Sequence, residues 1–186
     1  ILLLTACSDD KPKTADGGDS DKPNMTDQQL YDLGTEKMHQ GSYKGAITQF
    51  EEIERLYPFS KLATEAQLLQ AYANYKNEDY DDAIKLIDKF TKLHPGNASV
   101  PYAVYLKALC YYDRISDVKR DQKITRQALD ALKEVVTRFP ASDYGRDAKL
   151  KIDLVQDHLA GKEMEVGRFY LRGKQGKAAR VKEKKK

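Results

Sequence analysis

The chain has 186 residues, of which 33% are charged and 40% hydrophobic, and its mean hydropathy is −0.71. No stretch is apolar over the roughly 20 residues that a membrane-spanning helix needs, which excludes a chain built from such helices. Twelve Tyr, five Phe and no Trp supply the aromatic side chains, and only 11 Gly and 6 Pro occur. This composition argues against low-complexity and β-rich classes, so we expect long helices.

The formal net charge of +3 is unevenly spread along the chain. Residues 1–26 and residues 27–160 each carry a net charge of −2, whereas residues 161–186 carry +7. Phosphate binding needs Lys and Arg gathered on one face of the folded body, and a body of mixed, near-neutral charge lacks such a face. We therefore expect no nucleic-acid partner.

The N-terminal sequence Ile1-Leu2-Leu3-Leu4-Thr5-Ala6-Cys7 resembles the lipobox of bacterial lipoproteins, in which a signal peptidase cuts before a lipidated Cys. On this interpretation residues 1–6 are the remnant of a signal peptide and Cys7 carries the lipid. Residues 7–26 are rich in Asp, Lys, Gly and Pro, so we expect a flexible tether. Ser8 follows the Cys where inner-membrane lipoproteins usually have Asp, which favours the outer membrane. The alternative is an accidental apolar N-terminus with a free thiol.

The body of the chain repeats itself. Three pairs of residues are separated by 37 positions: Tyr43 and Tyr80, Ala46 and Ala83, and Pro58 and Pro95. The separation rises to 45 between Ala83 and Ala128 and between Pro95 and Pro140. Eight extra residues must therefore lie in the third unit, and the charged segment 113–123 predicts an exposed loop there.

Each unit reads as two amphipathic helices, with a small residue inside the first, Tyr and Ala opening the second, and Pro after the second ends. This is the tetratricopeptide pattern, and the first unit places Gly34, Tyr43, Ala46 and Pro58 at its spacing. Small residues let two helices approach closely, and Pro cannot continue a helix. The pattern predicts an all-α tetratricopeptide-repeat solenoid, a right-handed superhelix of antiparallel helix pairs.

The repeats divide the chain as follows. We expect one tetratricopeptide-repeat domain over residues 27–172, and a basic tail without fixed structure over 173–186. Within the domain the expected segments are repeats at about 27–60, 64–97 and 101–142, an extra helix at 143–159 and a partial repeat at 160–172. The partial repeat lacks a fitting second helix, because Gly176 stands where an aromatic residue belongs and Glu183 where a large apolar one belongs.

Several short sequences resemble the BamD family of outer-membrane assembly factors: Tyr57-Pro58-Phe59-Ser60, Ala71-Tyr72 with Tyr75-Lys76-Asn77, and Leu93-His94-Pro95. The resemblance covers about residues 27–172. It implies a lipid-anchored protein on the periplasmic face of the outer membrane, without enzymatic activity or cofactor. The implied partners are the barrel subunit BamA, other lipoproteins of the same BAM complex, and unfolded outer-membrane β-barrel proteins. The alternatives are another periplasmic tetratricopeptide adaptor of envelope biogenesis, or an accessory of a peptidoglycan enzyme.

One arc of each first helix is expected to line the concave face of the solenoid. Six of the twelve Tyr lie on these arcs: Tyr31, Tyr72, Tyr75, Tyr102, Tyr105 and Tyr112. Tyr offers rigid apolar area and a hydroxyl group, which suits an extended peptide. We predict a substrate-peptide site made of Tyr31, Tyr57, Phe59, Tyr72, Tyr75 and Lys76. The alternative is that these rings pack against neighbouring helices.

The remaining candidates concern partners and chemistry. The family contact with the barrel subunit falls in the terminal repeat, which suggests Phe169, Tyr170 and Arg172 as partner-binding residues. The only histidines are His39, His94 and His158, and none has a partner at metal-ligand spacing, so we predict neither a metal site nor a catalytic site. Cys110 is expected to be a small buried hydrophobic residue.

Overall fold

The computed structural model describes residues 25–115 and 122–183, with side chains up to residue 173. In this part of the chain seven α-helices follow one another and no strand occurs. They are α1 (Asp27–His39), α2 (Tyr43–Leu56), α3 (Lys61–Lys76), α4 (Tyr80–Leu93), α5 (Val100–Tyr112), α6 (Gln122–Arg138) and α7 (Asp143–Glu183). Cys7, the tether up to residue 24 and residues 116–121 of the predicted loop lie outside the described residues.

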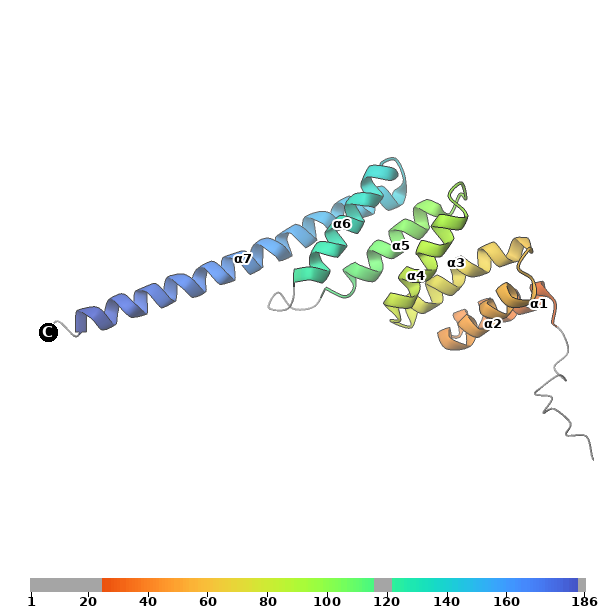
Figure 1. Ribbon diagram of the computed structural model, residues 1–186, viewed down its shortest axis with the longest axis horizontal. Coiled ribbons are helices and arrows are strands. Elements are labelled where there is room, and N and C mark those ends of the chain that lie inside the picture. Colours follow the sequence, from red (N-terminus) through yellow and green to blue (C-terminus); the bar gives the residue numbers. More distant parts are fainter. Residues whose placement is uncertain (1–24, 116–121, 184–186) are drawn as a thin grey trace, which may run out of the picture.

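The helices form successive pairs that stack side by side (Figure 1). Helices α1 and α2, α3 and α4, and α5 and α6 pack as hairpins, and each hairpin packs on the next through its neighbour in sequence. The first helices also touch one another, since α1 contacts α3, α3 contacts α5 and α5 contacts α7. These first helices therefore share one face. The predicted all-α tetratricopeptide-repeat solenoid is confirmed.

Small residues at equivalent positions hold the helices close together. Gly34 is buried, and the following Ala residues are 0% exposed: Ala46, Ala71, Ala83, Ala108 and Ala128. A Cβ atom at Gly34 would lie 2.6 Å from Cε1 of Phe50, a residue that is itself 1% exposed. The recurrence of small residues in the repeat thus follows from helix packing, because each small side chain leaves room for the facing helix.

The turns inside the first two pairs share one backbone conformation. Gly41 has a φ of 75° between α1 and α2, and Glu78 has a φ of 66° between α3 and α4. The two positions are 37 residues apart, the period of the repeat. The second pair starts at Lys61, three residues before the predicted 64, because the side chain of Ser60 caps α3 by accepting a hydrogen bond from the Leu62 N–H at 3.1 Å.

The C-terminal segment differs from the prediction. A single helix, α7, runs from Asp143 to Glu183, in place of a helix at 143–159, a separate partial repeat at 160–172 and an unstructured tail from 173. No Pro interrupts this stretch, and its many Lys, Glu, Arg and Ala residues favour helix. Its first half packs on the body, with Ala148 0% and Val155 1% exposed, whereas every residue from 163 to 173 is exposed. In Figure 1 the helix runs well past α5 and α6.

Candidate functional site

A groove of about 570 Å³ opens on the face shared by the first helices of the three units. Its walls come from α1, α3, α4, α5 and the turn that joins α4 to α5. The tyrosines of the predicted arcs that line the groove are Tyr31, Tyr72 and Tyr102, and Met38, Glu65 and Leu68 line it from the same sides of α1 and α3. The other lining residues were not predicted: Thr64, Leu69 and Phe90 lie on helices outside the arcs, and Asn97, Ala98 and Ser99 lie in the turn between α4 and α5. The turn residues carry no helical pattern, so no signal in the sequence could have placed them.

The described residues that line the groove are mainly apolar and aromatic, and the one charged residue among them is Glu65. The hydroxyl of Tyr31 donates to Oε2 of Glu65 at 3.4 Å, and its ring meets Phe50 edge-on at 6.3 Å. Burial, and then the charge of Glu65, raises the pKa of Tyr31. Burial also raises the pKa of Tyr102. Both side chains thus stay neutral at physiological pH and offer the groove hydroxyl groups beside apolar surface.

Two predicted residues of α3 lie outside the groove lining. The hydroxyl of Tyr75 donates to Oδ2 of Asp113 at 2.5 Å, and its ring lies between those of Tyr72 and Tyr80, at 6.2 and 6.0 Å. Tyr75 therefore ties α3 to the end of α5, as the packing alternative for these rings supposed. Lys76 is exposed at the last residue of α3, one helical turn beyond Tyr72.

The turn between α2 and α3 holds the start of α1. The hydroxyl of Tyr57 donates to the backbone carbonyl of Met25 at 2.8 Å, and Oγ of Ser60 donates to Oδ2 of Asp27 at 2.6 Å. Phe59, between them, is 101% exposed. Of the predicted site residues in this turn, Tyr57 is engaged in a structural contact and Phe59 is free, and neither lines the groove.

The predicted partner-binding residues lie on the projecting half of α7. Phe169 is 74% exposed and Tyr170 66%, and their rings meet edge-on at 5.8 Å. Arg172 is also exposed. No other helix of the described chain covers this segment, since α7 makes its contacts with α5 and α6 through its first half.

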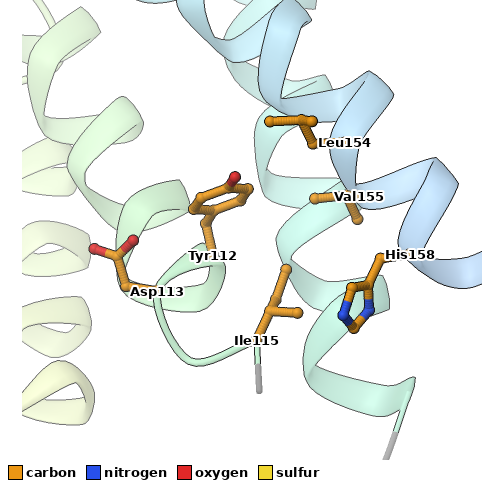
Figure 2. Close-up of a pocket in the computed structure, with 6 residues that line it drawn as sticks. All are labelled: Tyr112, Asp113, Ile115, Leu154, Val155 and His158. Atoms are coloured by element: carbon orange, nitrogen blue, oxygen red, sulfur yellow. The ribbon is translucent and has the colours of Figure 1, made fainter. Parts of the chain in front are cut away.

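A second hollow, of about 450 Å³, lies where α7 leaves the body (Figure 2). It is lined by Tyr112, Asp113 and Ile115 from the end of α5 and by Leu154, Val155 and His158 from α7. In Figure 2 the carboxylate of Asp113 points away from the His158 ring, in agreement with its bond to Tyr75. Asp113 and His158, the acid and the base among its described lining residues, are therefore not paired.

The described residues contain no group of three or more His, Cys, Asp or Glu placed to hold a metal ion. Among these helices none combines the length and apolar character needed to cross a membrane. Cys110 is 0% exposed, and burial raises the pKa of its thiol to about 12.

A family model described as an outer membrane lipoprotein, YfiO, matches residues 23–184. Three curated relatives are each called outer membrane protein assembly factor BamD. The protein from Caulobacter vibrioides is 44% identical over 87% of this chain and 55% of its own length. The proteins from Rickettsia prowazekii and Neisseria gonorrhoeae are 42% and 32% identical, over 96% and 92% of this chain and 68% and 67% of their own lengths.

The chain thus spans little more than half of the Caulobacter protein and about two thirds of the other two. Among solved structures, residues 41 to the end of MamA from Desulfovibrio magneticus RS-1 superpose with a TM-score of 0.50 at 19% identity. That match covers 77% of this chain and 76% of the MamA chain, and it supports the fold alone.

Proposed function

The chain belongs to the outer membrane lipoprotein family that includes the BamD assembly factors, and we propose that it is a scaffold of the β-barrel assembly machinery. In this role it binds unfolded outer-membrane β-barrel proteins and the barrel subunit, and it promotes barrel folding and insertion. Membership of a family of assembly factors supports a non-enzymatic role and disfavours the peptidoglycan-enzyme alternative.

The groove between the first helices is the observation that carries the substrate proposal. An extended C-terminal segment of a barrel protein alternates apolar and polar residues and ends in an aromatic side chain. Tyr72, Leu68 and Tyr102 would take its apolar side chains, and the tyrosine hydroxyls would meet its backbone. This retains Tyr31 and Tyr72 from the predicted site and adds Leu68 and Tyr102.

The carboxylate of such a segment does not suit the interior of the groove, because Glu65, the charged residue among the described lining residues, is negative. It would lie toward Lys76, one turn beyond Tyr72. An exposed ion pair of this kind contributes only about 0–1 kcal/mol. Affinity should therefore rest on the aromatic and apolar contacts.

Two further elements of the proposal concern the envelope. A lipid on Cys7 would hold the chain at the periplasmic face of the outer membrane, and mass spectrometry of the N-terminal peptide would show the added acyl chains. Phe169, Tyr170 and Arg172 are the proposed contacts with the barrel subunit. Affinity purification from the native envelope should recover that subunit, whereas another tetratricopeptide adaptor would not.

The groove is tested by titrating the chain with a fluorescent peptide of a barrel protein's C-terminus. Tyr72→Ser should weaken binding about three- to tenfold, because an aromatic contact is worth about 0.5–1.5 kcal/mol beyond its buried area. The matched control is Phe59→Ser, which removes a fully exposed ring outside the groove and should leave the affinity unchanged. Thermal unfolding of both variants checks that the fold is intact. Equal affinity of wild type and Tyr72→Ser would exclude the groove as the peptide site.

A further inference from the structure

The side of α3 that faces the groove changes in charge from one end of the helix to the other. Glu65, Leu68 and Tyr72 line the groove and are spaced three and four residues apart, so they lie on one side of the helix. Lys76 follows Tyr72 four residues later and ends the helix. This side of α3 therefore presents a carboxylate, an apolar side chain, an aromatic ring and an ammonium group, in that order.

The carboxylate of Glu65 is accessible to a cation. Glu65 is exposed, and none of the ion pairs between described residues involves it. Its hydrogen-bond partner, the hydroxyl of Tyr31 at 3.4 Å, is neutral. By contrast, Asp147 accepts a hydrogen bond from Tyr105 of the preceding first helix and also lies 3.3 Å from Nζ of Lys151. The charge of Glu65 is thus left for a segment that enters the groove.

We propose that Glu65 makes the groove selective for segments that carry a Lys or Arg side chain upstream of their aromatic end. This inference rests on the groove proposal above and adds which segments the groove prefers. A segment that complements α3 presents its groups in the matching order, with its cation beside Glu65 and its C-terminal carboxylate toward Lys76. An acidic side chain in place of the cation would be repelled by Glu65.

The geometry of α3 also gives the position of that cation in the segment. The helix advances by 11 residues from Glu65 to Lys76, which corresponds to about 16 Å. An extended segment advances about 3.3 Å per residue, so this length corresponds to about five residues. Successive side chains of an extended segment point to opposite sides, and the fourth and the sixth residues before the last share the side of the terminal aromatic residue. The cation therefore belongs at one of these two positions.

Short fluorescent peptides test the selectivity. Each alternates apolar and polar residues, ends in Phe, and carries Lys, Gln or Glu at the fourth residue before the last or, in a second series, at the sixth. Titration of the full chain should show the Lys peptide binding about three- to tenfold more tightly than the Glu peptide in one of the two series, because attraction replaces repulsion at an exposed pair. The difference should shrink at high salt, which screens exposed charges. Lys at the second residue before the last should give no gain, since that position lies near Lys76.

Substitution of Glu65 tests whether this residue reads the charge. Glu65→Gln should abolish the preference, and Glu65→Lys should reverse it, so that the Glu peptide binds more tightly than the Lys peptide. The matched control is Glu36→Lys, which makes the same change of charge at an exposed residue of α1 outside the described groove lining and should keep the wild-type preference. Tyr31→Phe removes the hydroxyl that bonds to Glu65 but leaves its carboxylate, so it should keep the preference too. Thermal unfolding checks that each variant is folded.

The outcomes separate this inference from the groove proposal. If wild type binds the Lys, Gln and Glu peptides equally while Tyr72→Ser still weakens binding, the charge selectivity is refuted and the groove remains the peptide site. A preference that Glu65→Lys does not reverse would also refute it, because another residue would then read the charge. A wild-type chain that binds none of the peptides, or that binds them unchanged after Tyr72→Ser, would overturn the groove proposal and this inference together.

Discussion

Gly34 shows how one side chain position can set the distance between two helices. Its backbone lies against the ring of Phe50, which is almost fully buried. A methyl group there must displace the ring or separate α1 from α2. The small residue that the repeat pattern singles out is therefore a packing requirement of the first helix pair.

We predict that Gly34→Ala destabilises the protein by about 1–2 kcal/mol. Overpacking a core costs about 1–3 kcal/mol, and the better helix propensity of Ala returns at most about 1 kcal/mol. The control is Gly96→Ala in the turn after α4, where a Cβ atom would meet nothing within 4 Å. Urea unfolding measures both variants. A Gly34→Ala protein as stable as the Gly96→Ala protein would contradict this account of the packing.

Three half-buried tyrosines make stability sensitive to alkaline pH. Burial, then hydrogen bonding to a carboxylate, raises the pKa of Tyr75 beside Asp113 and of Tyr105 beside Asp147, and burial raises that of Tyr102. A raised pKa means that the folded state favours the neutral phenol. This stability is fully present below about pH 10, the unfolded pKa, and is lost as the pH rises through the folded pKa.

Thermal unfolding should therefore give a steady Tm up to about pH 9 and a falling Tm above about pH 10. Tyr105→Phe lacks one titrating hydroxyl, so its Tm should fall less steeply over the same alkaline range. A Tm for wild type that does not fall up to about pH 12 would show that these phenols ionise freely in the folded protein.

At the scale of the element, the turns within the first two helix pairs reverse the direction of the chain. Gly41 and Glu78 occupy equivalent positions and share a left-handed backbone conformation. Only Gly adopts this conformation without a steric penalty, which for other residues is about 1–2 kcal/mol. Glu78 thus bears a local strain that Gly41 avoids.

Exchanging the residue types at these two positions should change the free energy of unfolding in opposite directions. Glu78→Gly should raise the free energy of unfolding by up to about 1 kcal/mol, whereas Gly41→Glu should lower it by about 1–2 kcal/mol. Chemical denaturation of the two single variants provides the comparison. A destabilised Glu78→Gly protein would mean that the Glu78 side chain makes a contact that outweighs its backbone strain.

The repeat spacing of 37 made the helix pairs and their buried small residues predictable, because packing between helices imposes that spacing directly. The single long α7 was not predictable from it. A helix can continue past the last repeat wherever no breaker stops it, and consensus positions do not report this.

The candidate site was predictable in part. Tyr31 and Tyr72 line the groove, but Tyr57 and Tyr75 donate hydrogen bonds to partners far away in sequence, at Met25 and Asp113.

At the scale of the whole described chain, the N-terminal helix pairs and the projecting half of α7 lie at opposite ends (Figure 1). The N-terminal units carry the aromatic groove, and the projecting half of α7 carries the exposed side chains of Val166, Phe169 and Tyr170. The proposed lipid at Cys7 precedes the groove-bearing end.

Site-specific photo-crosslinking in the native envelope tests the central claim most directly. A photoreactive residue at Leu68, inside the groove, should form adducts with unfolded outer-membrane β-barrel proteins during their assembly. The same group at Phe59, exposed but outside the groove, should form few. Adducts at Phe59 and none at Leu68 would contradict the account, because substrates would then pass the protein without entering the groove.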